Sequence, residues 1–141
     1  MAAYTGAVRV LALDYGSARC GCAVSDPTGS LATPIEPVAR ANTRRGLGRL
    51  RELIGQLGAE RVVVGLPLSL SGEDSEQTRE AREFAARLGQ AIGIPVELYD
   101  ERLTTVIAQR GGGRASEDSR AAAVLLEDWL AAHQQVEAAD G

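Results

Sequence analysis

The sequence contains no lysine: all 15 basic residues of this 141-residue chain are arginine. Arginine makes bidentate contacts with phosphate groups, so a surface rich in arginine suits such ligands. The net charge of −4 argues against strong non-specific binding of nucleic acid. Net charge says nothing about distribution, however, so composition does not exclude a local arginine face.

Cysteine is also scarce, because Cys20 and Cys22 are the only two. Residues two apart on a strand point to the same face, and such neighbours cannot readily form a disulfide. No histidine or second cysteine pair stands at a spacing typical of zinc sites. We therefore expect both cysteines to be small core residues of a protein from a reducing compartment.

Long apolar runs are missing too. No stretch approaches the roughly 18 residues that cross a bilayer, and the N-terminus lacks the basic and apolar regions of a signal peptide. We expect a cytoplasmic protein without a membrane partner. The length and a hydrophobic content of 45% predict a single domain over residues 1–141, with a core at about 8–133 and a frayed tail at 134–141.

Strand-like and helix-like segments alternate along the chain. Apolar and alternating runs predict strands over residues 8–14, 20–25, 33–39, 61–66 and 95–99. Helical spacing predicts helices over 43–57, 75–92, 103–110 and 116–133, the last two separated by glycines 111–113. The expected N-terminal caps are Asn42-Thr43 for the first helix, Asp74 or Ser75 for the second and Ser116 for the last. An antiparallel start followed by crossovers predicts an α/β fold, with a mixed five-stranded central sheet and helices on both faces.

Three acidic residues stand where such a sheet collects ligands. Asp14 ends the first strand beside a glycine turn, Glu101 follows the fifth strand, and Asp118 lies in the first turn of the last helix. Burying a carboxylate is costly unless hydrogen bonds, a cation or a metal compensate it. Ligands in open α/β sheets bind outside the carboxyl ends of the parallel strands, so we expect these three acids to converge.

Three neighbouring carboxylates repel one another unless a cation neutralises them, and hard cations such as Mg²⁺ or Mn²⁺ prefer oxygen ligands. Two such ions about 4 Å apart can activate water and stabilise the leaving oxygen of a phosphodiester. Simpler readings exist: Asp14 as a turn residue, Glu101 as the ion-pair partner of Arg102, and Asp118 as an acid at a helix N-terminus. Glu117 also competes with Asp118 as a ligand.

Other polar residues are candidates for substrate contact. Phosphate could be bound by Arg19, Arg102, Arg110 and Arg114, although each is equally well explained as a solvated charge. Ser17 and Ser69 offer neutral hydrogen bonds near the acids. The single histidine, His133, is expected near the C-terminal end of the last helix, where it acts as a helix-end residue and not as a general base.

Five short strings occur in order: LALDYG at 11–16, AVSD at 23–26, VGLPL at 64–68, DERLTT at 100–105 and DSRAA at 118–122. Together they resemble the bacterial YqgF/RuvX family of pre-16S rRNA nucleases, also called Holliday junction resolvase-like proteins, over residues 8–133. The resemblance implies a ribonuclease H-like fold and a cytoplasmic role in maturing the 5′ end of 16S rRNA. It also implies that Asp14, Glu101 and Asp118 occupy the family's acidic positions in a Mg²⁺- or Mn²⁺-dependent site.

Two positions depart from that family's pattern. Ser69 stands where relatives often carry asparagine, and residues 111–115 contain one basic residue where relatives are often rich in lysine. Both departures concern the affinity for substrate more than the metal site.

Other functions share this pattern of residues. One alternative is a DNA endonuclease of the Holliday junction resolvase type, and another is a non-catalytic module that binds nucleic acid. A third is nucleotide binding, because residues 14–17 also resemble the first phosphate loop of the sugar-kinase and actin superfamily. No motif reads bases, so the sequence does not choose between a ribosomal precursor RNA and branched DNA. It also leaves open whether the protein is a monomer or a homodimer, and a junction resolvase needs two sites.

Overall fold

The computed structural model describes residues 8–69, 71–101 and 117–140. Its elements are β1 (Val10–Asp14), β2 (Arg19–Ser25), β3 (Ala32–Ala39), α1 (Arg44–Leu57), β4 (Arg61–Leu66), α2 (Glu76–Ala91), β5 (Val96–Asp100) and α3 (Glu117–Asp140). These elements confirm the five predicted strands and three of the four predicted helices. The predicted helix at 103–110, the glycines at 111–113 and the cap at residue 116 lie outside the described residues.

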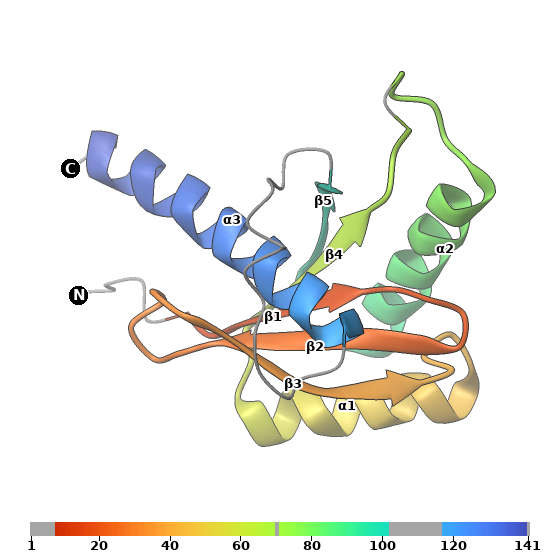
Figure 1. Cartoon of the computed structure of the whole chain (residues 1–141). Helices are drawn as coiled ribbons and strands as arrows, with labels where there is room; N and C mark the ends of the chain where they lie inside the picture. The colour runs from red at the N-terminus through yellow and green to blue at the C-terminus, as the bar shows by residue number, and fades with distance from the viewer. Residues whose placement is uncertain (1–7, 70, 102–116, 141) are drawn as a thin grey trace.

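The five strands form one mixed sheet in the order β3-β2-β1-β4-β5. The β1–β2 and β2–β3 pairs are antiparallel, whereas β1–β4 and β4–β5 are parallel. Helices α1 and α2 lie on one side of this sheet and α3 crosses the other (Figure 1). The predicted mixed sheet with helices on both faces is therefore confirmed.

Strand β1 contributes side chains to two hydrophobic cores, one on each face of the sheet, because its residues alternate between the faces. Leu11 and Leu13 are buried in the cluster that α1 and α2 cover. Val10 and Ala12 are buried in the cluster that α3 covers. Successive side chains of a strand point to opposite faces, so Asp14 at the end of β1 belongs to the α3 side.

Capping residues set the starts of the two helices on the other side. The hydroxyl of Thr43 accepts a hydrogen bond from the backbone N–H of Gly46, and Gly58 ends α1 in a left-handed conformation with φ of 68°. Ser75 and Thr78 form a reciprocal capping box at the start of α2. Both N-terminal caps agree with the sequence prediction.

The last helix is longer than expected. It continues to Asp140 and does not end near His133, because residues 134–140 are good helix formers without glycine or proline. His133 is therefore not a helix-end residue: its ring stacks on Trp129 at 3.7 Å, and its Nδ1 lies 2.9 Å from the Trp129 carbonyl oxygen. Within the described residues, no helix is both long and apolar enough to span a membrane.

Both cysteines behave as predicted. Cys20 and Cys22 are fully buried in the core beneath α1 and α2, and both are free thiols. Their side chains share one face of β2, as their spacing requires.

Candidate functional site

Glu101 reaches Asp14 by crossing a glycine. In the β1–β4 ladder Leu13 pairs with Val64, so the next residue of β4, Gly65, lies beside Asp14. A Cβ atom on Gly65 would lie 2.9 Å from Cδ of Glu101 and 3.1 Å from its Oε2. The side chain of Glu101 therefore occupies the space that any larger residue at position 65 would fill.

The two carboxyl groups meet on the α3 side of the sheet. A side-chain hydrogen bond links Asp14 and Glu101. Burial raises the pKa of Asp14 to about 6, and the negative charge of Asp118 adds to this increase. Burial also raises the pKa of Glu101 to about 7, with further contributions from Asp14 and Asp100. The pair therefore retains a shared proton close to neutral pH.

A second glycine, Gly21, lets the third acid, Asp118, approach Asp14 from the β2 side of β1. Gly21 of β2 pairs with Asp14 across the antiparallel ladder. A Cβ atom on Gly21 would overlap the carbonyl oxygen of Asp118 and approach the backbone nitrogen of Ser119. The first turn of α3 thus lies directly on β2 next to Asp14, which places Asp118 within electrostatic range of that carboxylate.

Ser119 fixes the start of α3 to the sheet. The register of β2 against β3 shifts between Cys20 and Cys22, and this bulge interrupts the ladder. The fully buried hydroxyl of Ser119 accepts a hydrogen bond from the Cys22 N–H at 3.3 Å and donates one to the Ile35 carbonyl at 2.5 Å. One side chain of α3 therefore satisfies two backbone groups that the bulge leaves unpaired.

A cavity of about 230 Å³ opens beside the carboxyl pair. It is lined by Asp14, Tyr15, Gly16, Ser17, Pro67, Gln77, Glu80 and Glu101. The ring of Tyr15 stacks on Phe84 with centroids 4.6 Å apart, which anchors the turn after β1 to the core. Three of the lining side chains are acidic, so the cavity suits a cation, or an anion bound together with a cation, better than an anion without one.

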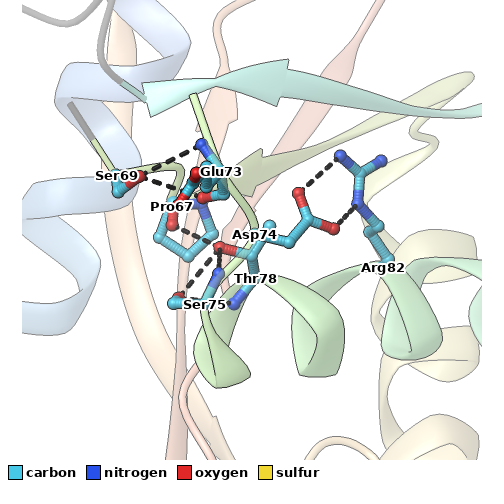
Figure 2. A network of polar contacts seen from close by, with 7 residues as sticks. All are labelled: Pro67, Ser69, Glu73, Asp74, Ser75, Thr78 and Arg82. Carbon is cyan, nitrogen blue, oxygen red and sulfur yellow. Dashed lines mark hydrogen bonds and ion pairs between the residues drawn. The ribbon is translucent and has the colours of Figure 1, made fainter. Parts of the chain in front are cut away.

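Ser17 lines this cavity, whereas Ser69 does not. Ser69 lies in the loop between β4 and α2, where its Oγ accepts a hydrogen bond from the Glu73 N–H at 3.1 Å and lies 2.9 Å from Oγ of Ser71. Thr78 ties the same loop to α2 by donating to the Pro67 carbonyl at 2.6 Å (Figure 2). The structure thus uses the Ser69 hydroxyl to close its own loop.

Of the four candidate arginines, only Arg19 belongs to the described residues. Arg19 is exposed at the start of β2, paired with Ala39, and is not among the residues that line the cavity. Arg102, Arg110 and Arg114 lie outside the described residues, as does the side chain of Glu117. Their predicted contacts with phosphate stay predictions.

Sequence reasoning missed the residues that bring the acids together. Gly65 and Ser119 fall within the strings at 64–68 and 118–122, but neither they nor Gly21 was assigned a part in the site. A glycine inside an apolar strand is nevertheless a recognised signal of close approach by another group, and Gly65 within the run Val62–Leu66 fits that signal.

A divalent cation such as Mg²⁺ needs several oxygen donors close to one point. Among residues 8–69, 71–101 and 118–133, no three acidic, histidine or cysteine side chains already stand close enough to hold a metal ion. The Asp14–Glu101 pair nevertheless presents carboxylate oxygens in a partly buried, acidic cavity. A bound cation would replace the proton that this pair retains, so the chemistry of the two groups fits a hard cation.

Comparison with known proteins identifies the family. The family model described as "RuvX: Holliday junction resolvase" matches residues 8–132. This chain belongs to the RuvX family. The match covers every described strand and the first two thirds of α3, so it includes all three acids.

Relatives of the chain carry a consistent name. Proteins called "Putative pre-16S rRNA nuclease" are 50% identical over 102 residues in Koribacter versatilis and 44% identical over 135 residues in Mycobacterium tuberculosis. These matches cover 72% and 89% of this chain, and 67% and 79% of the relatives. A third, from Maridesulfovibrio salexigens, is 38% identical and is covered over 98% of its length.

Solved structures support the fold. The RuvC protein of T. thermophilus, in complex with a Holliday junction substrate, matches with a TM-score of 0.59 at 17% identity, over 91% of this chain and 96% of that one. A second T. thermophilus RuvC structure gives a TM-score of 0.57. This likeness confirms the predicted ribonuclease H-like fold of the RuvX protein.

Proposed function

We propose that this RuvX protein is a nuclease that hydrolyses phosphodiester bonds at the 5′ end of precursor 16S rRNA in the cytoplasm. The observation that carries the proposal is the hydrogen-bonded Asp14–Glu101 pair in an acidic cavity at the carboxyl end of the parallel strands. Relatives that are named as pre-16S rRNA nucleases support the choice of substrate.

Asp14, Glu101 and Asp118 would hold Mg²⁺ or Mn²⁺, with two ions as the expected number. The bound metal would supply positive charge that offsets the charge of the phosphodiester and favours attack by water. Asp14 would be the central ligand, because the Glu101 side chain approaches it over Gly65 of β4 and the start of α3 approaches it over Gly21 of β2. The ligands must lose the proton that the pair retains, so cation binding requires a pH near or above the raised pKa values.

The residues around the acids position the substrate. Ser17 lines the cavity and offers a neutral hydrogen bond to a phosphate oxygen. Pro67 and Gln77 also line the cavity. Pro67 is held in place because Thr78 and the capping box fix the loop after β4 against α2 (Figure 2).

Cleavage of a four-way DNA junction is the second candidate. The description of the matching family model names this activity. A resolvase makes two symmetric cuts, so this function requires a homodimer in solution. Nucleotide binding is disfavoured, because a phosphate loop at residues 14–17 would face the acidic side chains of Glu80 and Glu101.

The test is cleavage by the purified protein with Mg²⁺ or Mn²⁺. The substrates are a precursor 16S rRNA 5′ leader, an unrelated single-stranded RNA and a four-way DNA junction. We expect metal-dependent cleavage of the leader, with no activity in Asp14→Asn and full activity in the control Glu52→Gln, an exposed acid of α1. Cleavage that survives Asp14→Asn would sink the proposed site, and cleavage of the junction alone would move the function to recombination.

A further inference from the structure

Positive charge is concentrated in one segment of this acidic chain. Residues 40–52 contain five arginines and one glutamate, a local charge of +4 in a chain of net charge −4. The arginines are Arg40, Arg44, Arg45, Arg49 and Arg51, and all are exposed. Within the described residues their one ion pair is the solvent-exposed 3.8 Å contact between Arg49 and Glu52. Such a pair contributes little, so these guanidinium groups are available to a ligand.

Two of these arginines line a groove between α1 and the edge strand β3. The groove has a volume of about 510 Å³, and Arg45 and Arg49 line it from one flank of α1, one helical turn apart. Apolar side chains such as Ile35 and Leu53 form part of its lining. Glu36 is the single carboxylate among its lining residues, so the groove carries a net positive charge.

One end of this groove lies next to the turn between β1 and β2, which borders the cavity of the acids. The backbone N–H of Arg40 donates a 3.0 Å hydrogen bond to the carbonyl of Ala18, in the turn between β1 and β2. Arg19, at the end of that turn, pairs with Ala39, which lines the groove. Helix α1 begins at the same end of the sheet as this turn (Figure 1).

The separation suits a strand of nucleic acid. Strand β3 lies two positions from β1 in the sheet, which is about 10 Å at a strand spacing of about 4.8 Å. A nucleic-acid strand covers that distance in about three nucleotides at a rise of about 3.4 Å each. Because α1 and the side chain of Asp14 lie on opposite sides of the sheet, the path between Arg45 and Asp14 runs around the β1–β2 turn and is longer than this strand spacing. Phosphates of one strand can still occupy both places, several nucleotides apart.

We propose that Arg45 and Arg49 bind the phosphodiester backbone of the strand that is cut at Asp14, with Arg19 and Arg40 between them and the cavity. This inference rests on the proposed nuclease function and names its substrate-binding surface. Arginine recognises phosphate through paired N–H donors. Binding here would offset the repulsion between an anionic substrate and the acidic cavity. Such a contact is independent of base sequence, because the phosphate group is the same at every nucleotide.

The test compares two double variants with matched loss of charge. Arg45→Gln/Arg49→Gln removes the groove arginines. The control Arg51→Gln/Arg79→Gln removes one exposed arginine from the other flank of α1 and one from α2. Binding of a labelled single-stranded RNA and of a four-way DNA junction is measured without divalent cation, over a range of salt concentrations. Thermal unfolding confirms that both variants are folded.

We expect the groove variant to bind the RNA more weakly than wild type, with the slope of log affinity against log salt reduced by about 1.4, or two phosphate contacts at about 0.7 each. The control should keep the wild-type slope. Equal binding by the two variants would overturn the proposal, as would failure of the wild type to bind either nucleic acid. A slope that changes with the junction alone would assign the groove to DNA and overturn its role with RNA.

Cleavage assays separate this inference from the proposed function. With a long RNA we expect the groove variant to cut more slowly than the control, and with a short RNA that ends before the groove we expect equal rates. Groove-dependent binding by a protein that never cuts would retain the binding surface and reject the nuclease. Cutting that is indifferent to Arg45 and Arg49 at every RNA length would retain the nuclease and reject the surface.

Discussion

Gly65 and Glu101 share one volume of space: the position of a Cβ on the glycine lies 2.9 Å from Cδ of the glutamate. Real Cβ atoms do not approach other atoms so closely, so the two residues are coupled. The absence of a side chain on β4 is what allows Glu101, which follows β5, to reach Asp14 on β1 across the strand between them.

Replacing Gly65 by alanine should disable the site without unfolding the protein. The added methyl group must push the Glu101 carboxyl group away from Asp14, and a displacement of about 1 Å at a catalytic group can reduce kcat about 100-fold. We expect kcat to fall with little change in KM. The control is Gly48→Ala in the exposed part of α1, where an added Cβ meets nothing within 4 Å. A Gly65→Ala protein with wild-type kcat would show that Glu101 does not need its present position.

Removing a charge from the carboxyl pair should stabilise the protein at neutral pH. Both pKa values are raised in the folded state, to about 6 for Asp14 and about 7 for Glu101, so the folded protein binds more protons than the unfolded chain between about pH 4 and pH 7. The free energy of unfolding of the wild type therefore falls as pH rises through that range. Asp14→Asn, which cannot ionise, should be more stable than wild type by about 1–3 kcal/mol at pH 8 without divalent cation.

Denaturant unfolding at pH 4.5 and pH 8 tests this prediction. The advantage of Asp14→Asn should shrink at pH 4.5, where the wild-type pair is protonated. Glu101→Gln should follow the same trend, and Glu52→Gln should not. A variant that is less stable than wild type at pH 8 would contradict the repulsion inferred between these acids.

Divalent cations should offset the loss of stability that ionisation of Asp14 and Glu101 causes. Mn²⁺ competes with protons for Asp14 and Glu101, so the increase in Tm on adding Mn²⁺ should be larger at pH 8 than at pH 5. Asp14→Asn and Glu101→Gln should each reduce this increase. Scanning fluorimetry with EDTA as the reference measures the effect without any assay of activity. An increase in Tm that is equal at both pH values would place the cation elsewhere.

Ser119 should matter to both stability and activity. Ser119→Ala removes the hydrogen-bond partner of the buried Cys22 N–H and of the partly buried Ile35 carbonyl, which costs about 1–3 kcal/mol. It also loosens the start of α3, so activity should fall through Asp118. The control is Ser71→Ala in the exposed loop after β4. If both variants unfold at the same denaturant concentration, the bulge does not depend on Ser119.

Local sequence determined most of the framework. Apolar runs fixed the strands, and the capping groups of Thr43 and Ser75 fixed the starts of α1 and α2. Alternation along β1 even determined which face Asp14 would take. These features depend on neighbouring residues and on backbone geometry, which are visible in the sequence. The end of α3 was misjudged because good helix formers at 134–140 continue the helix.

The assembly of the site was decided by tertiary structure alone. Ser119 bonds to Cys22 and Ile35, which are 97 and 84 residues away in the chain, and Gly65 makes room for a side chain that belongs to the end of a different strand. The sequence identified Asp14, Glu101 and Asp118 as candidates because carboxylates at strand ends need compensation. It could not show that two glycines flank Asp14, because close packing between distant segments depends on the shapes of both partners and leaves no periodic pattern in either.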